Sequence, residues 1–182
     1  MRNVLIAVFA IVLVVAFANA QTTSSTATDV YTIETAGTGV TVSASAPADI
    51  TDLQGGYTYT VTPLDDGTAI LTPADVTGNQ DVSPFQWEID TDPFTNLTVS
   101  FVLPTVLVGT LDGAPALHCS FGPQSLIIEG SGAVYNPNVA NTIFNTTGTL
   151  LMDLGITVTI PPGAVADAYT GNVTCQASIT GL

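Results

Sequence analysis

Apolar and polar side chains alternate along several segments of this chain, and this alternation constrains the fold more than any other feature of the sequence. It is clearest over residues 57–62, 85–92, 97–103, 156–160 and 172–179. Successive side chains of a β-strand point to opposite faces, so each segment predicts a strand with one buried and one solvated face. Shorter runs rich in β-branched residues are weaker candidates: residues 30–33, 40–44, 69–71, 106–111, 117–121 and 126–129.

Turn-forming residues separate these runs. They are Gly55-Gly56, Asp65-Asp66-Gly67, Asp112-Gly113, Gly122-Pro123 and Pro161-Pro162-Gly163. No stretch after Ala20 has a helical period over the length of a helix. Many short strands joined by turns predict an all-β fold, an antiparallel β-sandwich of the Ig-like or pilin-like kind, which forms a single domain over residues 29–182.

The first 20 residues have the three parts of a secretory signal peptide. Arg2 provides the positive charge, Val4–Phe17 is apolar, and Ala18-Asn19-Ala20 is a small-residue cleavage site. The alternative is a retained anchor or a pilin-type helix, but 14 apolar residues are short for a bilayer core of about 30 Å. The mature chain is therefore expected outside the cell or on its surface, beginning with a polar leader over residues 21–28.

Charge excludes several function classes. The chain has 15 acidic residues and one Lys or Arg, which is Arg2, so removal of the signal peptide leaves no Lys or Arg. Nucleic acids and anionic membranes are then unsuitable partners, because both are bound through cationic side chains. Enzymes that need a catalytic lysine or an arginine clamp are excluded as well. No later segment is apolar enough for membrane insertion, and the expected partner is another copy of the chain, in a homo-oligomer or filament.

Two cysteines stand in strands whose alternation points them inward. Cys119 shares a face with Leu117 and Phe121, and Cys175 shares a face with Val173 and Ala177. In an oxidising compartment this pattern predicts a Cys119–Cys175 disulfide. The alternative is two unrelated buried thiols, because free cysteine packs as a small apolar residue.

The sequence offers little for catalysis. His118 is the one histidine, and its side chain should point away from Cys119 because the two are neighbours in a strand. A zinc site would need further ligands, and no serine lies in a Gly-x-Ser-x-Gly motif. We therefore expect that the protein is not an enzyme and that His118 is a surface residue.

Glu88, Asp90 and Asp92 are the densest acidic group. Their spacing would place three carboxylates on one strand face, where they could bind Ca²⁺, which takes six to eight oxygen ligands. Paired carboxylates for glycoside hydrolysis and a plain solvated face are the alternatives. Asp65-Asp66-Gly67 is a weaker calcium candidate that also fits a simple turn. Calcium is the one cofactor that the sequence suggests.

Three sites match the N-glycosylation sequon, at Asn96, Asn145 and Asn172. Asn96 and Asn172 fall on the polar faces of their expected strands, which would leave them accessible to a glycan.

From residue 84 to residue 182 the chain resembles an uncharacterised family of small bacterial secreted β-sandwich proteins. The resemblance rests on Pro84-Phe85-Gln86-Trp87, Leu103-Pro104, the closing segment Leu154–Pro161 and Ala168–Thr174. It implies a pilin-like or adhesin-like extracellular sandwich without known catalysis, and it transfers no functional residue.

Two functions remain open. The first is a structural protein of the cell surface or an extracellular filament, in which residues 21–33 add a strand to the sheet edge of a neighbouring copy. The second is an extracellular module that binds calcium or a glycan. A secreted hydrolase is a third and weaker hypothesis, because the chain has few groups that could stabilise an oxyanion.

Overall fold

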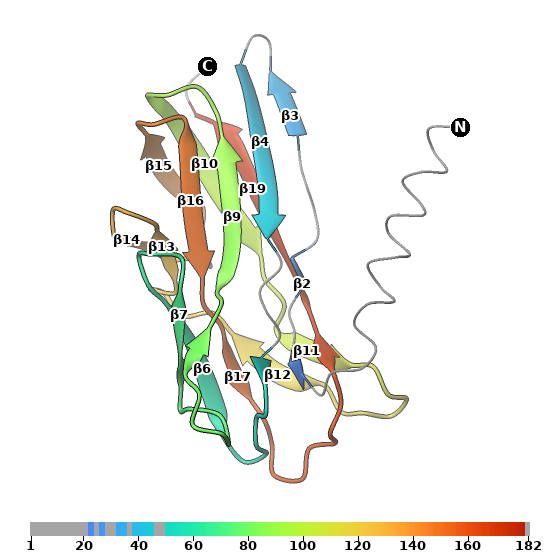
Figure 1. Ribbon diagram of the computed structural model, residues 1–182. Coiled ribbons are helices and arrows are strands. Elements are labelled where there is room, and N and C mark those ends of the chain that lie inside the picture. The colour runs from blue at the N-terminus through green and yellow to red at the C-terminus, as the bar shows by residue number, and fades with distance from the viewer. Residues whose placement is uncertain (1–21, 24–25, 28–31, 36–37, 46–49, 181–182) are drawn as a thin grey trace, which may run out of the picture.

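The structure is a computed structural model that describes residues 22–23, 26–27, 32–35, 38–45 and 50–180, with side chains described from Val40 onward within these ranges. The expected signal peptide, residues 1–20, lies outside the described residues. The described part contains β-strands and no helix (Figure 1), which confirms the all-β prediction. It therefore contains no helix long and apolar enough to cross a membrane.

The strands, in chain order, are β1 (Thr22–Thr23), β2 (Thr26–Ala27), β3 (Thr32–Thr35), β4 (Thr38–Ser45), β5 (Ile50–Thr51), β6 (Thr58–Pro63), β7 (Ala69–Thr72), β8 (Asp81–Val82), β9 (Phe85–Asp90), β10 (Thr95–Val102), β11 (Val106–Gly109), β12 (Leu117–Ser120), β13 (Leu126–Ile128), β14 (Ala133–Tyr135), β15 (Asn141–Asn145), β16 (Thr149–Leu154), β17 (Thr157–Thr159), β18 (Tyr169–Thr170) and β19 (Asn172–Ile179). The five segments with clear alternation correspond to β6, β9, β10, β17 and β19. The expected turns between strands are also present.

The described strands form three sheets. A six-stranded sheet has the order β14-β13-β16-β9-β4-β3, and a four-stranded sheet has the order β15-β10-β19-β2. A nine-stranded sheet, β5-β1-β18-β11-β12-β17-β6-β7-β8, forms the other end of the molecule (Figure 1). The described strands pair antiparallel except for β1 with β18 and β2 with β19.

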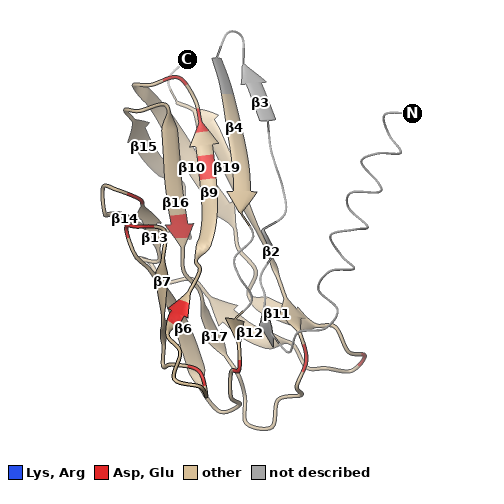
Figure 2. Cartoon of the chain, viewed as in Figure 1, with Lys and Arg blue, Asp and Glu red and all other residues tan. Residues whose placement is uncertain are grey.

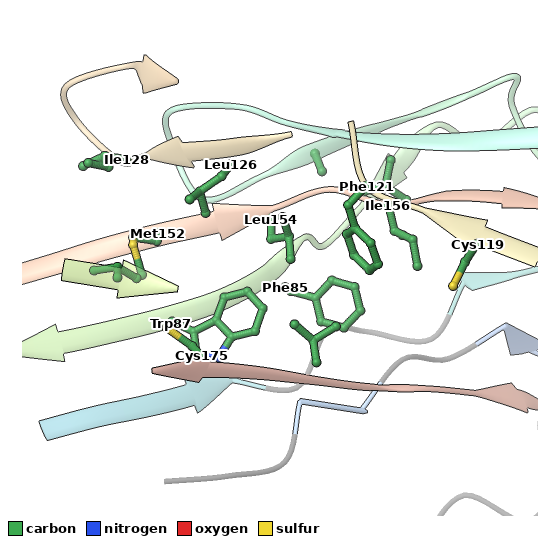
Figure 3. Close-up of a cluster of buried hydrophobic side chains, with 14 of the residues drawn as sticks. Phe85, Trp87, Cys119, Phe121, Leu126, Ile128, Met152, Leu154, Ile156 and Cys175 are labelled. Atoms are coloured by element: carbon green, nitrogen blue, oxygen red, sulfur yellow. The ribbon is translucent and has the colours of Figure 1, made fainter. Parts of the chain in front are cut away.

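The six-stranded and four-stranded sheets face each other across one apolar core. Trp87 on β9 is 2% exposed and meets the edge of Phe101 on β10, with ring centroids 5.3 Å apart. The buried side chains form one cluster that also reaches β6, β12 and β17 of the nine-stranded sheet (Figure 3). One shared core makes the described part a single sandwich-like domain.

Candidate functional site

Glu88 and Asp90 project from the outer face of β9, opposite the buried Trp87 and Ile89. Glu88 is exposed, whereas Asp90 is half-buried and accepts a hydrogen bond from Thr149 Oγ1 at 2.8 Å. β9 ends at Asp90, so Asp92 lies in the following turn and does not extend the strand face. The described residues contain no group of three His, Cys, Asp or Glu side chains that could hold a metal. Calcium binding by this trio stays a prediction.

Asp65, Asp66 and Gly67 form the turn between β6 and β7. Asp66 Oδ1 accepts hydrogen bonds from Thr68 Oγ1 at 2.6 Å and from Thr68 N at 3.1 Å. These bonds lower the pKa of Asp66, with the side-chain bond contributing most. The Asp66 carboxylate thus caps its own turn, as in an Asx-turn.

The predicted disulfide between Cys119 and Cys175 is wrong, because both cysteines are free. Both point inward as expected, and each is 1% exposed. However, Cys119 pairs with Val158 in the nine-stranded sheet and Cys175 pairs with Phe101 in the four-stranded sheet. The two thiols lie well apart in the cluster shown in Figure 3, with Cys175 beside Trp87. Alternation assigns a side chain to a face, but it carries no information on position within the core.

Burial makes both thiols poor nucleophiles. It raises the pKa of Cys119 to about 11 and that of Cys175 to about 12. Cys119 Sγ also donates to the Pro104 carbonyl oxygen at 3.4 Å. His118 is exposed on the opposite face of β12, as predicted. These residues therefore do not form a Cys–His pair.

The three sequons differ in accessibility. Asn96 and Asn172 are exposed, as expected from their strand faces. Asn145 is 2% exposed, and its Nδ2 is buried without a hydrogen-bond partner among the described residues. Its Oδ1 accepts bonds from the backbone nitrogens of Thr147 and Gly148, each at 3.2 Å. In the folded chain the amide nitrogen that would carry a glycan is accessible only at Asn96 and Asn172 among these sequons.

A hollow of about 440 Å³ lies beside β5, β7 and β8. Its wall includes the apolar Ile50 and Val82 and the acidic Asp75 and Asp81. Asp75 Oδ1 already accepts bonds from Thr77 N, Thr77 Oγ1 and Asn79 N at 2.7 to 2.9 Å. No aromatic side chain is among the lining residues, so the hollow lacks the platform on which a sugar ring would stack.

A different acidic group lies near the carboxyl end of β16. Asp153 is 0% exposed, and neither of its carboxylate oxygens has a hydrogen-bond partner in the described part of the chain. It pairs in register with Gln86 on β9 and Ile127 on β13. Figure 2 shows acidic segments near this end of β16 and no Lys or Arg in the described residues.

The β6–β7 turn covers this end of the sheet. Gln86 Nε2 donates to the Gly67 carbonyl oxygen at 3.1 Å and lies 3.5 Å from Glu129 Oε1. The backbone nitrogen of Gly130 donates to the Asp65 carbonyl oxygen at 2.9 Å. The turn is thus tied to both β9 and the segment after β13, and it closes over Asp153.

The pKa of Asp153 is raised to about 7, chiefly by burial, and the negative charges of Glu129 and Asp66 contribute to the rise. The neighbouring Gln86 side chain acts in the opposite direction and lowers this pKa. Asp167 is a useful contrast, because it is also largely buried. Burial alone would raise the pKa of Asp167, but bonds from Thr110 Oγ1 and the Leu111 nitrogen lower it overall. Asp153 is the buried carboxylate that lacks such donors.

Sequence reasoning missed Asp153. The signal was present, since this acidic residue interrupts the apolar run Leu150–Leu154. However, an acidic residue in such a run also fits a loop or a strand end. The β6–β7 turn that acts on Asp153 through Asp66 is 86 residues or more earlier in the chain.

A comparison with models of known families found no match for this chain. A search of curated proteins also found no matching relative. The resemblance of residues 84–182 to secreted β-sandwich proteins therefore stays a prediction.

Proposed function

We propose that the protein is a secreted structural subunit of the cell surface or of an extracellular filament, and that its amino-terminal segment links copies by strand addition. The observation that carries this proposal is the parallel pairing between the two ends of the chain. Thr23 of β1 is opposite Tyr169 of β18, and Thr26 and Ala27 of β2 are opposite Asn172 and Val173 of β19.

These pairings are made by main-chain groups, which are the same in every copy of the chain. A segment from a neighbouring copy could therefore form the same ladder on β18 and β19 at no loss of hydrogen bonds. β3 offers a further exchangeable pairing, from Thr32 opposite Thr41 to Thr35 opposite Thr38 of β4. An exchange of the amino-terminal segment between copies would convert a monomeric sandwich into a subunit of a filament.

Among the described residues, the pairing along the edge that would receive the segment is short. On its β10 side, β19 is paired from Thr174 to Ile179. On its β2 side, the pairing within the described residues covers Asn172 and Val173. Unpaired strand edges are sites at which another strand can add. Composition supports a noncovalent link, because a mature chain without lysine cannot form lysine isopeptide crosslinks.

The test is to delete residues 21–34 from the mature chain and to compare both proteins by electron microscopy and size-exclusion chromatography. We expect the intact chain to assemble and the deletion variant to remain a folded monomer with a β-type circular dichroism spectrum. A synthetic peptide of residues 21–35 should bind the deletion variant and block assembly of the intact chain. Undiminished assembly of the deletion variant, or an intact chain that stays monomeric at all concentrations, would overturn the proposal.

If the deletion variant does not fold, two single substitutions test strand addition instead. Ile33→Pro removes a backbone donor from the β3 ladder, and Ala116→Pro places the same residue in an exposed loop position before β12. We expect Ile33→Pro to raise the concentration needed for assembly about tenfold, by weakening the exchanged ladder. Ala116→Pro should leave it unchanged, and equal behaviour of the two variants would contradict strand addition.

A further inference from the structure

We propose that the covered end of the six-stranded sheet is a calcium site, in which Asp153 and Glu129 provide two carboxylates and the Gly67 carbonyl and Gln86 amide provide further oxygens. This group is distinct from Glu88, Asp90 and Asp92, and it is independent of strand addition. Four separate segments meet there: β16, β9, the residue after β13 and the β6–β7 turn.

Asp153 has no positively charged group near it among the described residues. A carboxylate that is 0% exposed and has no hydrogen-bond partner is strongly destabilised when ionised. The groups that face it are Gln86, Glu129 and Asp66, so its neighbours are neutral or negative. The mature chain has no Lys or Arg, and His118 is exposed on β12 in another sheet. When Asp153 is ionised, a bound cation would therefore supply the compensating charge that these neighbours lack.

Two oxygen atoms, from Gly67 and Glu129, already lie around the Gln86 amide nitrogen. Gln86 Nε2 lies 3.1 Å from the Gly67 oxygen and 3.5 Å from Glu129 Oε1. The oxygen and nitrogen of a side-chain amide are nearly interchangeable in shape, so rotation of the Gln86 amide would place its oxygen at this point. An ion bound beside this oxygen, the Gly67 oxygen and Glu129 Oε1 would replace the amide nitrogen as the positive group of the site.

The donor set selects calcium among common cations. The proposed site would combine the carboxylates of Asp153 and Glu129 with the neutral oxygens of Gly67 and Gln86 and with water, since the described residues contain no group of three His, Cys, Asp or Glu side chains that could hold a metal. Two carboxylates balance a divalent charge. Calcium accepts oxygen ligands in flexible geometry, whereas Mg²⁺ requires near-octahedral geometry and zinc prefers nitrogen and sulfur. A site formed from a turn, two strand positions and the residue after a third strand fits the flexible ion best.

The experiment measures calcium binding by the mature chain after treatment with a chelator. Isothermal titration at about pH 8 should give about one ion per chain, and calcium should raise the midpoint of thermal unfolding by several degrees. Binding should weaken about tenfold or more at about pH 5, because Asp153 must lose its proton to bind the ion. Asp153→Asn should abolish both effects. Asp112→Asn, the same change at an exposed turn residue, should preserve them.

Three results would overturn the calcium site. One is no binding and no thermal shift with calcium at about pH 8, which would mean that Asp153 keeps a proton and shares it with Glu129. Another is an unchanged calcium response in Asp153→Asn, which would place any bound ion elsewhere. If Asp153→Asn does not fold, Glu129→Gln replaces it, and an unchanged response in that variant has the same meaning.

Discussion

The outer face of the six-stranded sheet behaves differently at its two ends. At one end Glu88 and Asp90 face solvent, as the alternation of β9 predicts. At the other end Gln86 and Asp153 lie on the same face, but the β6–β7 turn covers them. Alternation decides which face a side chain occupies, and the packing of a distant turn decides whether that face is wet or dry. A carboxylate at the open end is solvated, whereas Asp153 at the covered end is buried and has a raised pKa.

The largest effect should come from separating β16 from the strand that carries the covering turn. A Cβ at Gly155 would collide with the Val61 carbonyl oxygen and lie 2.7 Å from Pro63 Cδ. Both belong to β6, so we expect Gly155→Ala to lower the free energy of unfolding by about 4 kcal/mol. Gly122→Ala is the control, since nothing lies within 4 Å of its Cβ position. Urea denaturation of both variants measures the difference, and equal stabilities would contradict close packing of β6 on β16.

The second effect is a pH dependence that belongs to the covered end alone. The pKa of Asp153 is raised to about 7 in the folded state, so the unfolded chain ionises this group first. The contribution of Asp153 to the free energy of unfolding should therefore be fully present below about pH 4. It should be lost as the pH rises from about 4 through about 7. We expect a loss of about 2 kcal/mol without calcium, because water and local relaxation relieve part of the cost of the charge.

Asp153→Asn should remove this loss, and Asp90→Asn should retain it. Urea titrations between about pH 4 and about pH 8 in the presence of a chelator measure the effect. Parallel pH profiles for the wild type and Asp153→Asn would show that Asp153 is not buried as the structure has it.

The third effect concerns the cover itself. Gly67 has a φ of 80°, and a Cβ there would lie 3.1 Å from Gln86 Nε2. Gly78 has a φ of 87° with nothing within 4 Å, so it reports the backbone strain without the contact. We expect both alanine variants to be destabilised and Gly67→Ala to lose about 1 kcal/mol more, because its side chain would also push the turn away from the sheet. Equal losses by denaturation would mean that the turn does not press on Gln86.

The smallest effect is expected at the open end. Glu88 is exposed, and its neighbours on the strand face make no ion pair with it among the described residues. Glu88→Gln should therefore change the free energy of unfolding by less than about 0.5 kcal/mol. A large loss, or a calcium response that disappears in this variant, would move the calcium site back to Glu88, Asp90 and Asp92.

Individual strands show how far sequence reasoning reached. β9 and β19 alternate throughout, and their burial follows the predicted faces. β16 was missed because Leu150–Leu154 contains an apolar run broken by one acid and has no period of two. On its outer face Leu151 is exposed and Asp153 is buried. The covering turn therefore removes the alternation of buried and exposed residues from which strands are predicted. The cysteine pairing failed for a related reason, since two inward-facing side chains can lie well apart in one core.

The amino-acid sequence by itself determined that this chain forms strands, where its turns lie, and that the chain after residue 20 contains no Lys or Arg to neutralise its carboxylates. These are local properties, set by side-chain alternation, backbone preference and composition. Only the tertiary structure decided which sheet each cysteine joins and which carboxylate is removed from water. Burial arises where segments far apart in the chain pack together, and a local pattern of residues does not predict which distant segments will pack.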